Sequence, residues 1–484
     1  MAPFDLLVIG GGITGTAVAR LAARNGWSVA LLERADLAAG ASSNTSHMLH
    51  GGLRYLEHGQ FSLVREALHE RGTVSKLAPE LARPTRFLIP FYRRERRPRW
   101  MVRLGLGLYD AFAGRANLAP HTVVSAREAL ALEPDLEPKG LLGAGLYSDA
   151  VMDDARLTVA VARDAALHGA AIHTYTDMQG ARPIDGGLIE VLSRDVISGE
   201  ERRFVARVIV NAAGSWVDRV RTRLSRSLAP GSPDPAPVLR PSRGVHLVLP
   251  PVTRGHGLLL FAPEDGRVFF TVPFGGATLV GTTEVEVPSP PGASDYGPTV
   301  EEVRYLRAAI GRALPGREES PVLAVTSGVR PLLAGDQDVG GASREHRVFE
   351  DGPVISIAGG KYTTFRVMAR HAFERAAVRL GRAGKRMRDP LDPLPRPLGD
   401  THDVEPLAEF AVDSEFARRI DDVVRRRTHL WLTPDRGRVA APRIAAVLAR
   451  KLGWSDEQQR EELEIFHGVL NDEERLLIHA RKET

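Results

Sequence analysis

The sequence predicts an α/β protein (α+β overall): a Rossmann-like nucleotide-binding domain interleaved with a β-sheet domain, followed by a C-terminal helical cap. Three observations lead to this prediction. The chain opens on a strand, a glycine-rich turn, a helix and a second strand. Strand and helix patterns return further along, separated by segments with the alternation typical of sheets. The last part, about residues 400–484, is helical in pattern. A chain of 484 residues is too long for one core, so two or three domains are expected.

The first element is a glycine-rich turn between a strand and a helix. An apolar run at 6–9, typical of a buried parallel strand, leads into the pattern Gly10-x-Gly12-x-x-Gly15. Gly10 permits a tight turn, Gly12 lets the backbone approach a pyrophosphate, and Gly15 allows the following helix to pack closely on the strand. The N-terminus of that helix offers free N–H groups and the positive end of its dipole to phosphates.

A second apolar run, 29–32, ends at an acidic residue. Glu33 lies about 20 residues after the glycines, where an acid binds the ribose hydroxyls of a dinucleotide, and we assign Arg34 to the same site. Strand, glycines, helix, strand and acid together predict a dinucleotide site. The pattern does not separate NAD from FAD.

The later elements divide the chain into three predicted domains. Helical patterns are found at 157–166 and from residue 363, strand patterns at 205–210, 244–250, 267–273, 278–286 and 354–357, and Pro-rich connections at 227–241 and 390–399. The predicted nucleotide-binding domain is discontinuous and comprises residues 1–80, 145–225 and 325–385. A substrate domain comprises residues 81–144 and 226–324, and the cap comprises residues 390–484.

Composition excludes several kinds of site. The chain has no cysteine, which excludes disulfides, thiolate catalysis, iron–sulfur clusters and cysteine-based zinc sites, and we predict no metal site. No apolar run reaches the about 18 residues of a membrane span, and no basic segment precedes an apolar one at the start, so a cytosolic or cytosol-facing protein is expected. The 64 Lys and Arg residues are nearly balanced by 60 Asp and Glu residues. The basic residues are not grouped into a patch with interleaved aromatic residues, so no nucleic acid partner is expected.

The stretch 41–57 gathers polar and conformationally permissive residues just after the second strand. Small hydroxyl side chains can hydrogen-bond phosphate or ring atoms, and paired glycines let the backbone pass close to a planar ligand. A histidine, an arginine and a tyrosine place a titratable base, a fixed cation and a phenol within one short stretch. The candidate site residues in this stretch are Ser42, Ser43, His50, Gly51, Gly52, Leu53, Arg54 and Tyr55.

The run HGGLRYLE at 50–57, after the glycine-rich opening, resembles the FAD-dependent glycerol-3-phosphate dehydrogenase family, of the aerobic, quinone-linked type. Other stretches resemble family motifs in the right order: 147–149, 153–157, 210–216, 243–246, 281–284, 327–332, 343–346, 359–366 and 425–428. Three positions depart from the family's usual residues: His47 stands for Lys, Ser215 for Pro and Glu284 for Asp.

The resemblance implies further contacts with the cofactor. Ala213 and Gly214 follow a buried strand and allow a nucleotide to approach the backbone, whereas Trp216 is expected to pack rather than stack. The segment 359–366 opens a helix, whose N–H groups can stabilise negative charge on a flavin as it is reduced. Its candidate residues are Gly360, Lys361, Thr363 and Thr364.

The resemblance also implies an activity and a fold similar to that of D-amino-acid oxidase. In this family non-covalent FAD takes a hydride from C2 of glycerol 3-phosphate, leaving dihydroxyacetone phosphate, and a membrane quinone takes the electrons. His50 or His246 would accept the hydroxyl proton, since an imidazole has a pKa near working pH. Arg54, Arg330 and Lys361 would hold the phosphate, and Tyr55 would orient the glycerol part.

Two other functions stay open. One is an oxygen-using flavin oxidase of glycerol 3-phosphate, or of an amino acid or amine; the other is a catalytically silent nucleotide-binding protein. The basic stretch 93–99, followed by Trp100 and an apolar segment to residue 109, predicts peripheral contact with an anionic membrane surface. The expected location is therefore the cytoplasm, at the cytoplasmic face of the inner membrane, with a homodimer left open.

Overall fold

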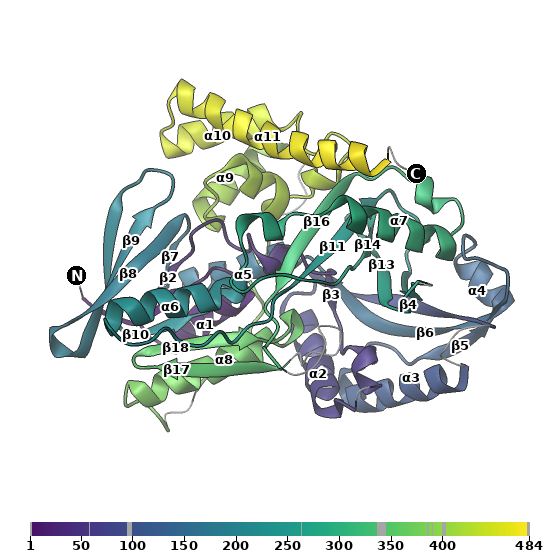
Figure 1. Cartoon of the computed structure of the whole chain (residues 1–484), viewed down its shortest axis with the longest axis horizontal. Coiled ribbons are helices and arrows are strands. Elements are labelled where there is room, and N and C mark those ends of the chain that lie inside the picture. The colour runs from purple at the N-terminus through teal and green to yellow at the C-terminus, as the bar shows by residue number, and fades with distance from the viewer. Residues whose placement is uncertain are drawn as a thin grey trace.

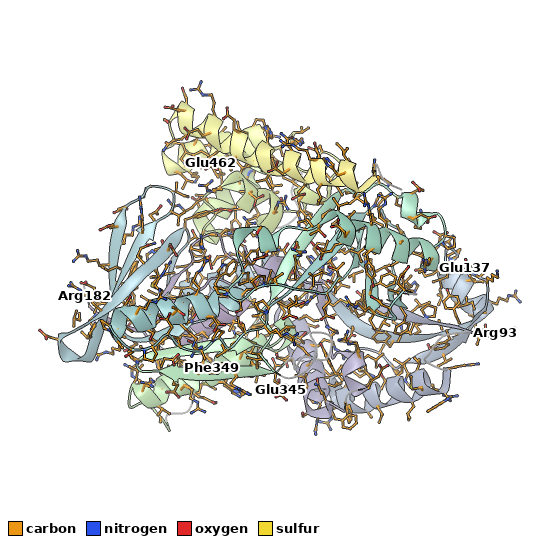
Figure 2. The ribbon with its side chains drawn as sticks, viewed as in Figure 1. Arg93, Glu137, Arg182, Glu345, Phe349 and Glu462 are labelled. Carbon is orange, nitrogen blue, oxygen red and sulfur yellow. The ribbon has the colours of Figure 1, made fainter. Side chains whose placement is uncertain are left out.

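Two mixed sheets and a C-terminal group of helices make up the computed structural model (Figure 1). It describes residues 2–57, 59–93, 99–262, 264–335, 345–384, 387–389, 391–398 and 403–481. The two sheets lie side by side along the longest axis. Arg182, on the first sheet, and Arg93, beside the second, lie near opposite ends of the molecule (Figure 2). Among the described residues, no helix is both long and apolar enough to cross a membrane.

The first sheet has the parallel core that the opening of the chain predicts. Its eight strands run in the order β17-β18-β10-β1-β2-β7, with β9 paired to β10 and β8 to β9. The bounds are β1 Phe4–Ile9, β2 Val29–Leu32, β7 Ala171–His173, β8 Thr176–Ile184, β9 Leu188–Asp195, β10 Glu201–Asn211, β17 His346–Asp351 and β18 Val354–Gly359. Five of them, β1, β2, β7, β10 and β18, are mutually parallel.

Helices cover both faces of this sheet because the buried strands are apolar on both sides. The helices on one face are α1 (Ile13–Arg24), α5 (Asp154–Leu167) and α8 (Phe365–Arg379). On the other face, α6 (Val217–Leu228) packs with β8 and β9. Asp153 caps α5 by accepting a hydrogen bond from the Arg156 N–H at 3.0 Å.

The second sheet belongs to the other body of the molecule. Its ten strands run in the order β15-β11-β14-β13-β12-β4-β6-β3, with β16 paired to β11 and β5 to β6. The bounds are β3 Met48–Leu49, β4 Ala82–Tyr92, β5 Thr122–Ser125, β6 Leu141–Met152, β11 Ser242–Leu249, β12 Gly257–Phe261, β13 Val268–Phe274, β14 Ala277–Gly281, β15 Val285–Glu286 and β16 Ala324–Arg330. The predicted domain boundaries at 145 and 325 fall within β6 and β16.

Four helices pack around the second sheet: α2 (Phe61–Leu77), α3 (Arg99–Ala113), α4 (Ala126–Leu132) and α7 (Val300–Ala313). Short helical turns lie at Ala41–Ser43, Leu53–Leu56, Gly114–Ala116, Asp185–Gly187, Gly214–Trp216, Ala293–Tyr296, Arg317–Glu319, and Tyr362–Thr364. The predicted continuous strand 278–286 is interrupted, because the chain leaves the sheet between Gly281 and Val285.

The C-terminal cap is helical, as predicted. It comprises α9 (Val404–Glu415), a π-helical turn (Asp422–Arg427), a short turn (Leu430–Leu432), α10 (Ala441–Leu452) and α11 (Asp456–Arg481). In Figure 1 it lies across the top of both bodies. The α/β fold class with a C-terminal helical domain is confirmed.

The cap is attached to the first body by buried ion pairs. The fully buried Asp36, just beyond β2, accepts from Arg427 Nη1 and Nη2 at 2.7 Å each and from Arg426 Nε at 2.6 Å. On α5, Arg156 binds Glu415 at 2.6 and 2.7 Å. These bidentate pairs fix the orientation of the cap as well as holding it.

Candidate active site

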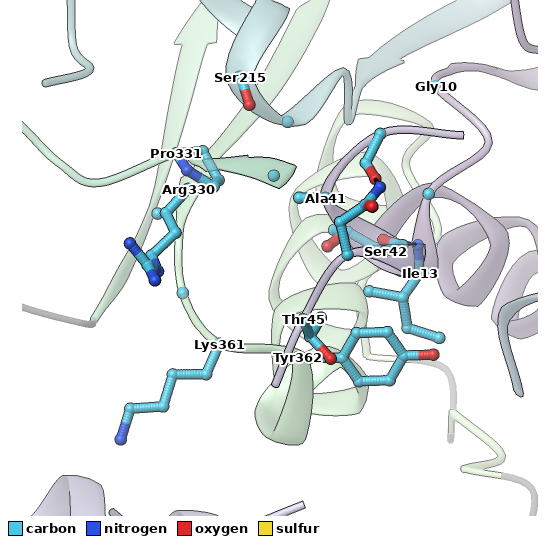
Figure 3. Close-up of a pocket in the computed structure, with 18 of the residues that line it drawn as sticks. Gly10, Ile13, Ala41, Ser42, Thr45, Ser215, Arg330, Pro331, Lys361 and Tyr362 are labelled. Carbon is cyan, nitrogen blue, oxygen red and sulfur yellow. Dashed lines mark hydrogen bonds between the residues drawn. The ribbon is translucent and has the colours of Figure 1, made fainter. Parts of the chain in front are cut away.

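A cavity of about 540 Å³ lies between the two bodies, beyond the carboxyl ends of β1, β2 and β10. Open parallel sheets bind their ligands at this edge. Figure 3 shows Ser42 and Ile13 on one side of the cavity, with Arg330 and Lys361 reaching into the other side. The cavity therefore has a turn suited to phosphate at one end and cations at the other.

The glycine turn has no room for larger side chains. Gly10 has φ +110°, and a Cβ there would lie 2.6 Å from the carbonyl oxygen of Ala212. A Cβ on Gly15 would lie 1.9 Å from the oxygen of Gly10, so α1 packs directly on the turn. Next to Gly12, the Ile13 N–H at the start of α1 donates to Ser42 Oγ at 3.0 Å. This places a hydroxyl beside the helix N-terminus, where a pyrophosphate would bind.

Glu33 closes the nucleotide end of the cavity. Its carboxylate accepts hydrogen bonds from the Gly11 N–H at 2.6 Å and the Ala35 N–H at 2.8 Å. Burial raises the pKa of Glu33, while the two backbone donors oppose that rise. One clear structural role of Glu33 is therefore to hold the glycine turn against the end of β2.

The segment after β18 forms the opposite wall. Gly359 and Gly360 have φ of +77° and +87°, and a Cβ on Gly360 would lie 2.4 Å from the sulfur of Met368. The chain then enters the turn Tyr362–Thr364 and continues into α8. Thr363 Oγ1 lies 3.4 Å from the His50 nitrogen and 3.5 Å from its carbonyl oxygen, so this wall contacts the loop that follows β3.

The three cations predicted to bind the substrate phosphate all line the cavity: Arg54, Arg330 and Lys361. Arg330 Nη2 donates to Thr282 Oγ1 at 2.7 Å, and a Cβ on Gly244 would lie 2.1 Å from this nitrogen. The glycine at 244 thus gives the guanidinium its space. Lys361 Nζ lies 3.7 Å from the centre of the Tyr55 ring, a cation–π contact. Neighbouring side chains therefore orient Arg330 and Lys361, and all three cations line the same cavity.

The two candidate bases differ in their surroundings. His246 is buried, and its Nε2 lies 2.9 Å from Ser46 Oγ. Burial, followed by the charges of Arg330 and His47, lowers the pKa of His246 to about 3. The ring of His246 is therefore neutral at neutral pH. His50 lies on the loop with Arg54 and Tyr55, at the junction with Thr363.

Most of the predicted site residues line this one cavity. They are Gly10, Gly12, Glu33, Arg34, Ser42, His50, Gly52, Leu53, Arg54, Tyr55, Ala213, Gly214, Trp216, His246, Arg330, Gly360, Lys361 and Thr363. Trp216 also stacks face to face on Tyr296, with ring centres 4.7 Å apart and planes 7° apart.

Four other predicted residues support the wall from outside the lining. Gly15 packs behind Gly10, and Gly51 lies against Leu68 and Tyr109. Thr364 Oγ1 donates to the Lys361 oxygen at 3.3 Å, and Ser43 Oγ accepts from Asn44 at 3.3 Å.

Sequence reasoning missed several lining residues, among them Ser46, Asp149, Arg219, Arg223 and Thr282. Ser46 and Thr282 lie within or beside motifs that were identified, so their short hydroxyl side chains were a usable signal. Arg219 and Arg223 belong to α6, whose sequence resembles that of any charged surface helix.

The three departures from the family motifs have different structural settings. His47 is outside the cavity lining: it is buried, packs at a tilt against the Phe274 ring and has Nδ1 3.5 Å from Asp154. Ser215 donates to the Val329 oxygen at 2.7 Å, joining the first body to β16. Glu284 lines the cavity in the interruption between β14 and β15. Of the stretch 343–346, residues 343 and 344 lie outside the described residues.

The cavity fits FAD. Its glycine turn has no room for a Cβ at Gly10 or Gly15, as the tight turn of a dinucleotide site requires, and Glu33 and Arg34 line the nucleoside end. Between the glycine turn and the nucleoside end, the wall is lined by the small residues Gly40, Ala41 and Ser42. The opposite wall presents the start of α8, where the positive end of the helix dipole favours electron-rich atoms.

Comparisons with known proteins agree with this reading of the cavity. Residues 5–366 match the family described as FAD dependent oxidoreductase, and residues 392–459 match the C-terminal domain of alpha-glycerophosphate oxidase. The fold superposes on the glycerol-3-phosphate dehydrogenase of Bacillus halodurans, solved with FAD, with a TM-score of 0.76 and 24% identity, covering 96% of this chain and 94% of the other. The chain is therefore an FAD-dependent oxidoreductase, and its cofactor is FAD.

Proteins with similar sequences show to which family of FAD-dependent oxidoreductases the chain belongs. The glycerol-3-phosphate dehydrogenase of Mycobacterium leprae is 32% identical over 97% of this chain and 88% of its own. The D-erythritol 1-phosphate dehydrogenase of Brucella abortus is 39% identical over 77% of this chain and 73% of its own. The chain belongs to the FAD-dependent glycerol-3-phosphate dehydrogenase family.

Proposed function

We propose that this enzyme oxidises sn-glycerol 3-phosphate to dihydroxyacetone phosphate, passing the C2 hydride to FAD. The main support is that one cavity joins a dinucleotide turn to three cations and two histidines. The names of the mycobacterial relatives point to the same substrate.

The cations are suited to the phosphate of the substrate. A guanidinium binds two phosphate oxygens at once, and an ammonium binds as a point charge. Arg330 is already oriented by Thr282 Oγ1 at 2.7 Å, so its fork is not free to turn away. Arg54 and Lys361 supply the remaining positive charge that balances the phosphate. Tyr55, whose ring contacts Lys361 Nζ, is placed to orient the glycerol part.

His50 is the base in this proposal. A general base works best with a pKa near the operating pH, and the lowered pKa of His246, about 3, makes it a poor proton acceptor. The neutral His246 ring instead offers hydrogen bonds and is positioned through Ser46. FAD, when bound, supplies the acceptor for the hydride. The N-terminus of α8 favours negative charge on the ring that faces it.

The function is tested by mixing the purified yellow protein with sn-glycerol 3-phosphate without oxygen. The flavin absorbance should bleach, and dihydroxyacetone phosphate should form in equal amount. Reoxidation is then followed with oxygen in one sample and a soluble quinone in another. A spectrum unchanged by the substrate, but bleached by dithionite, would refute the proposed function.

A second candidate is oxidation of a four-carbon polyol phosphate. The chain is 39% identical to the D-erythritol 1-phosphate dehydrogenase of Brucella abortus and 32% identical to the glycerol-3-phosphate dehydrogenase of Mycobacterium leprae. The alignment with the first of these enzymes covers less of this chain. Both substrates share a phosphate and an adjacent chain of hydroxyls, so the same cations serve. Comparing kcat/KM for glycerol 3-phosphate and D-erythritol 1-phosphate decides between them.

We further propose that the electrons go to a membrane quinone, with the protein bound at the cytoplasmic face of the inner membrane. Helix α3 supports this, since Trp100, Leu104 and Leu108 are 67%, 57% and 38% exposed along one face. Arg99 and Arg103 on the same helix are exposed as well. Such a face suits an interface with anionic lipid. Arg94, Arg96 and Arg97 lie outside the described residues. Oxygen is the alternative acceptor.

A further inference from the structure

We propose that Tyr109, with the buried pair Arg71 and Asp149, is a positioning residue for the reaction, acting through the backbone of Gly51. The inference rests on the proposed function, because it concerns the loop 50–55 that holds the candidate base and two substrate contacts. None of the three residues belongs to the motif stretch 41–57.

The three side chains form one buried hydrogen-bonded set. Tyr109 is 2% exposed and Arg71 is 0% exposed. Arg71 Nη1 donates to Asp149 Oδ1 at 2.7 Å and to the Ser148 oxygen at 2.9 Å, and its Nη2 donates to the Ala116 oxygen at 3.0 Å. Tyr109 donates its hydroxyl proton to the Asp149 carboxylate, whose oxygens lie 2.8 and 2.9 Å away.

The free lone pairs of the Tyr109 hydroxyl face the loop. The Gly51 N–H donates to the Tyr109 oxygen at 2.7 Å. Contact is close enough that a Cβ on Gly51 would lie 2.8 Å from that oxygen and 2.5 Å from Leu68 Cγ. The direction of these bonds is fixed, since the carboxylate can only accept from the hydroxyl. Burial, and then the Asp149 charge, raise the pKa of Tyr109 and keep its proton in place.

The loop is thereby held between two bodies. Tyr109 on α3 holds Gly51 from the substrate side, and Thr363 before α8 contacts the His50 backbone from the FAD side. His50, Gly52, Arg54 and Tyr55 then face the cavity. Since a misplacement of about 1 Å can cost about 100-fold in rate, a missing anchor at Gly51 should be visible in catalysis.

Tyr109→Phe tests this because it removes one oxygen and leaves the ring in place. The matched control is Tyr175→Phe, which also removes a buried hydroxyl bonded to an aspartate, Asp422 at 2.7 Å, but lies outside the cavity lining. Both variants should retain FAD and lose similar thermal stability. Only Tyr109→Phe should slow anaerobic flavin reduction at saturating substrate, by about 10–100-fold.

Hydrogen exchange gives a second readout that needs no substrate. In Tyr109→Phe the Gly51 amide loses its acceptor at 2.7 Å and keeps only the Asp149 carboxylate as a partner, so peptides covering residues 48–56 should exchange faster while peptides from α1 should not. Should Tyr109→Phe lose FAD, Arg71→Lys is the next variant, because Arg71 lies outside the cavity lining and orients the Asp149 carboxylate that holds the Tyr109 hydroxyl. Slowed reduction in that variant supports the inference.

A reduction rate within twofold of wild type, in either FAD-bound variant, would overturn the inference, as would unchanged exchange at residues 48–56. Failure of the proposed function is a separate result: wild type itself would then not be bleached, while the exchange experiment would still report on the anchor.

Discussion

Arg330 is the cation whose orientation the structure explains most fully, and its loss should affect the phosphorylated substrate alone. Arg330→Ala should raise the KM for glycerol 3-phosphate by about 10–100-fold, since a charge-assisted hydrogen bond contributes about 1.5–3 kcal/mol. Arg330→Lys keeps the positive charge but loses the two-pronged guanidinium group, so its KM should lie between those of wild type and Arg330→Ala. FAD absorbance should be retained, and glycerol should be oxidised equally poorly by all three proteins. An unchanged KM would remove Arg330 from the phosphate site.

The two histidines are separable by kinetics. His50→Gln should lower the rate of flavin reduction by about 10²–10⁴ and remove the rise of rate with pH near neutrality, as expected for loss of a general base. His246→Gln should lower the rate less and leave the pH profile in place, because the His246 ring is neutral throughout this range. The opposite pattern would make His246 the base.

The lowered pKa of His246 also affects stability. Its folded pKa, about 3, is below the unfolded value of about 6.5, so the unfolded chain binds the extra proton between these values. Stability is therefore full above about pH 6.5 and falls as the pH drops towards 3. His246→Gln should reduce this dependence by up to about 1.4 kcal/mol for each pH unit, measured as the urea midpoint from pH 4 to 7. Identical slopes in both proteins would contradict the burial of a neutral ring.

At the scale of elements, α3 should act as the membrane contact. Changing Trp100, Leu104 and Leu108 to Gln should weaken binding to anionic vesicles at low salt, since each exposed apolar side chain loses its interfacial contact. The matched control changes three other exposed apolar residues on α11, Ile465, Val469 and Ile478, to Gln. Co-sedimentation with vesicles measures both. Equal binding by the two triple variants and wild type would favour a soluble acceptor or oxygen.

The sequence predicted the elements of the first body well because their buried strands and helix have clear periods. The second body was harder. The strand predicted at 278–286 is two strands, since nothing in its alternation shows that Thr282 to Glu284 turn away to line the cavity. The sequence shows only an apolar segment to residue 109, because Gly105 and Gly107 have low helix propensity, yet α3 forms there with Leu106 and Tyr109 buried.

At the scale of the whole molecule, Asp36 joins the cap to the nucleotide-binding body. Asp36→Asn leaves the positive charges of Arg426 and Arg427 buried without the negative charge that they pair with. Breaking a buried ion pair in this way lowers the free energy of unfolding by about 3–5 kcal/mol. The melting temperature should fall by several degrees, and the cap should become sensitive to protease. Glu409→Gln, which breaks the exposed pair with Arg450, should cost less than about 1 kcal/mol. Equal effects of the two changes would show that the cap is held by apolar contacts instead.

The sequence indicated which residues belong to the candidate site, but not how these residues pack together in the fold. Motifs named His50, Arg330 and Lys361, which lie far apart in the sequence and line one cavity. Sequence alone could not show that His246 is buried beside Arg330, nor that Arg427 reaches back to Asp36, because both depend on how distant segments pack. Local patterns report which residues a turn can hold; burial and charge pairing are properties of the complete fold.

If both proposals hold, helix α3 has a different task on each of its faces. Trp100, Leu104 and Leu108 point outward, whereas Leu106 and Tyr109 are buried on the other side. Substitutions on the outer face can change which surface the enzyme adheres to without altering the backbone that Tyr109 contacts. On these two proposals, membrane binding and catalysis would therefore be separately mutable, although a single helix of 15 residues contributes to both.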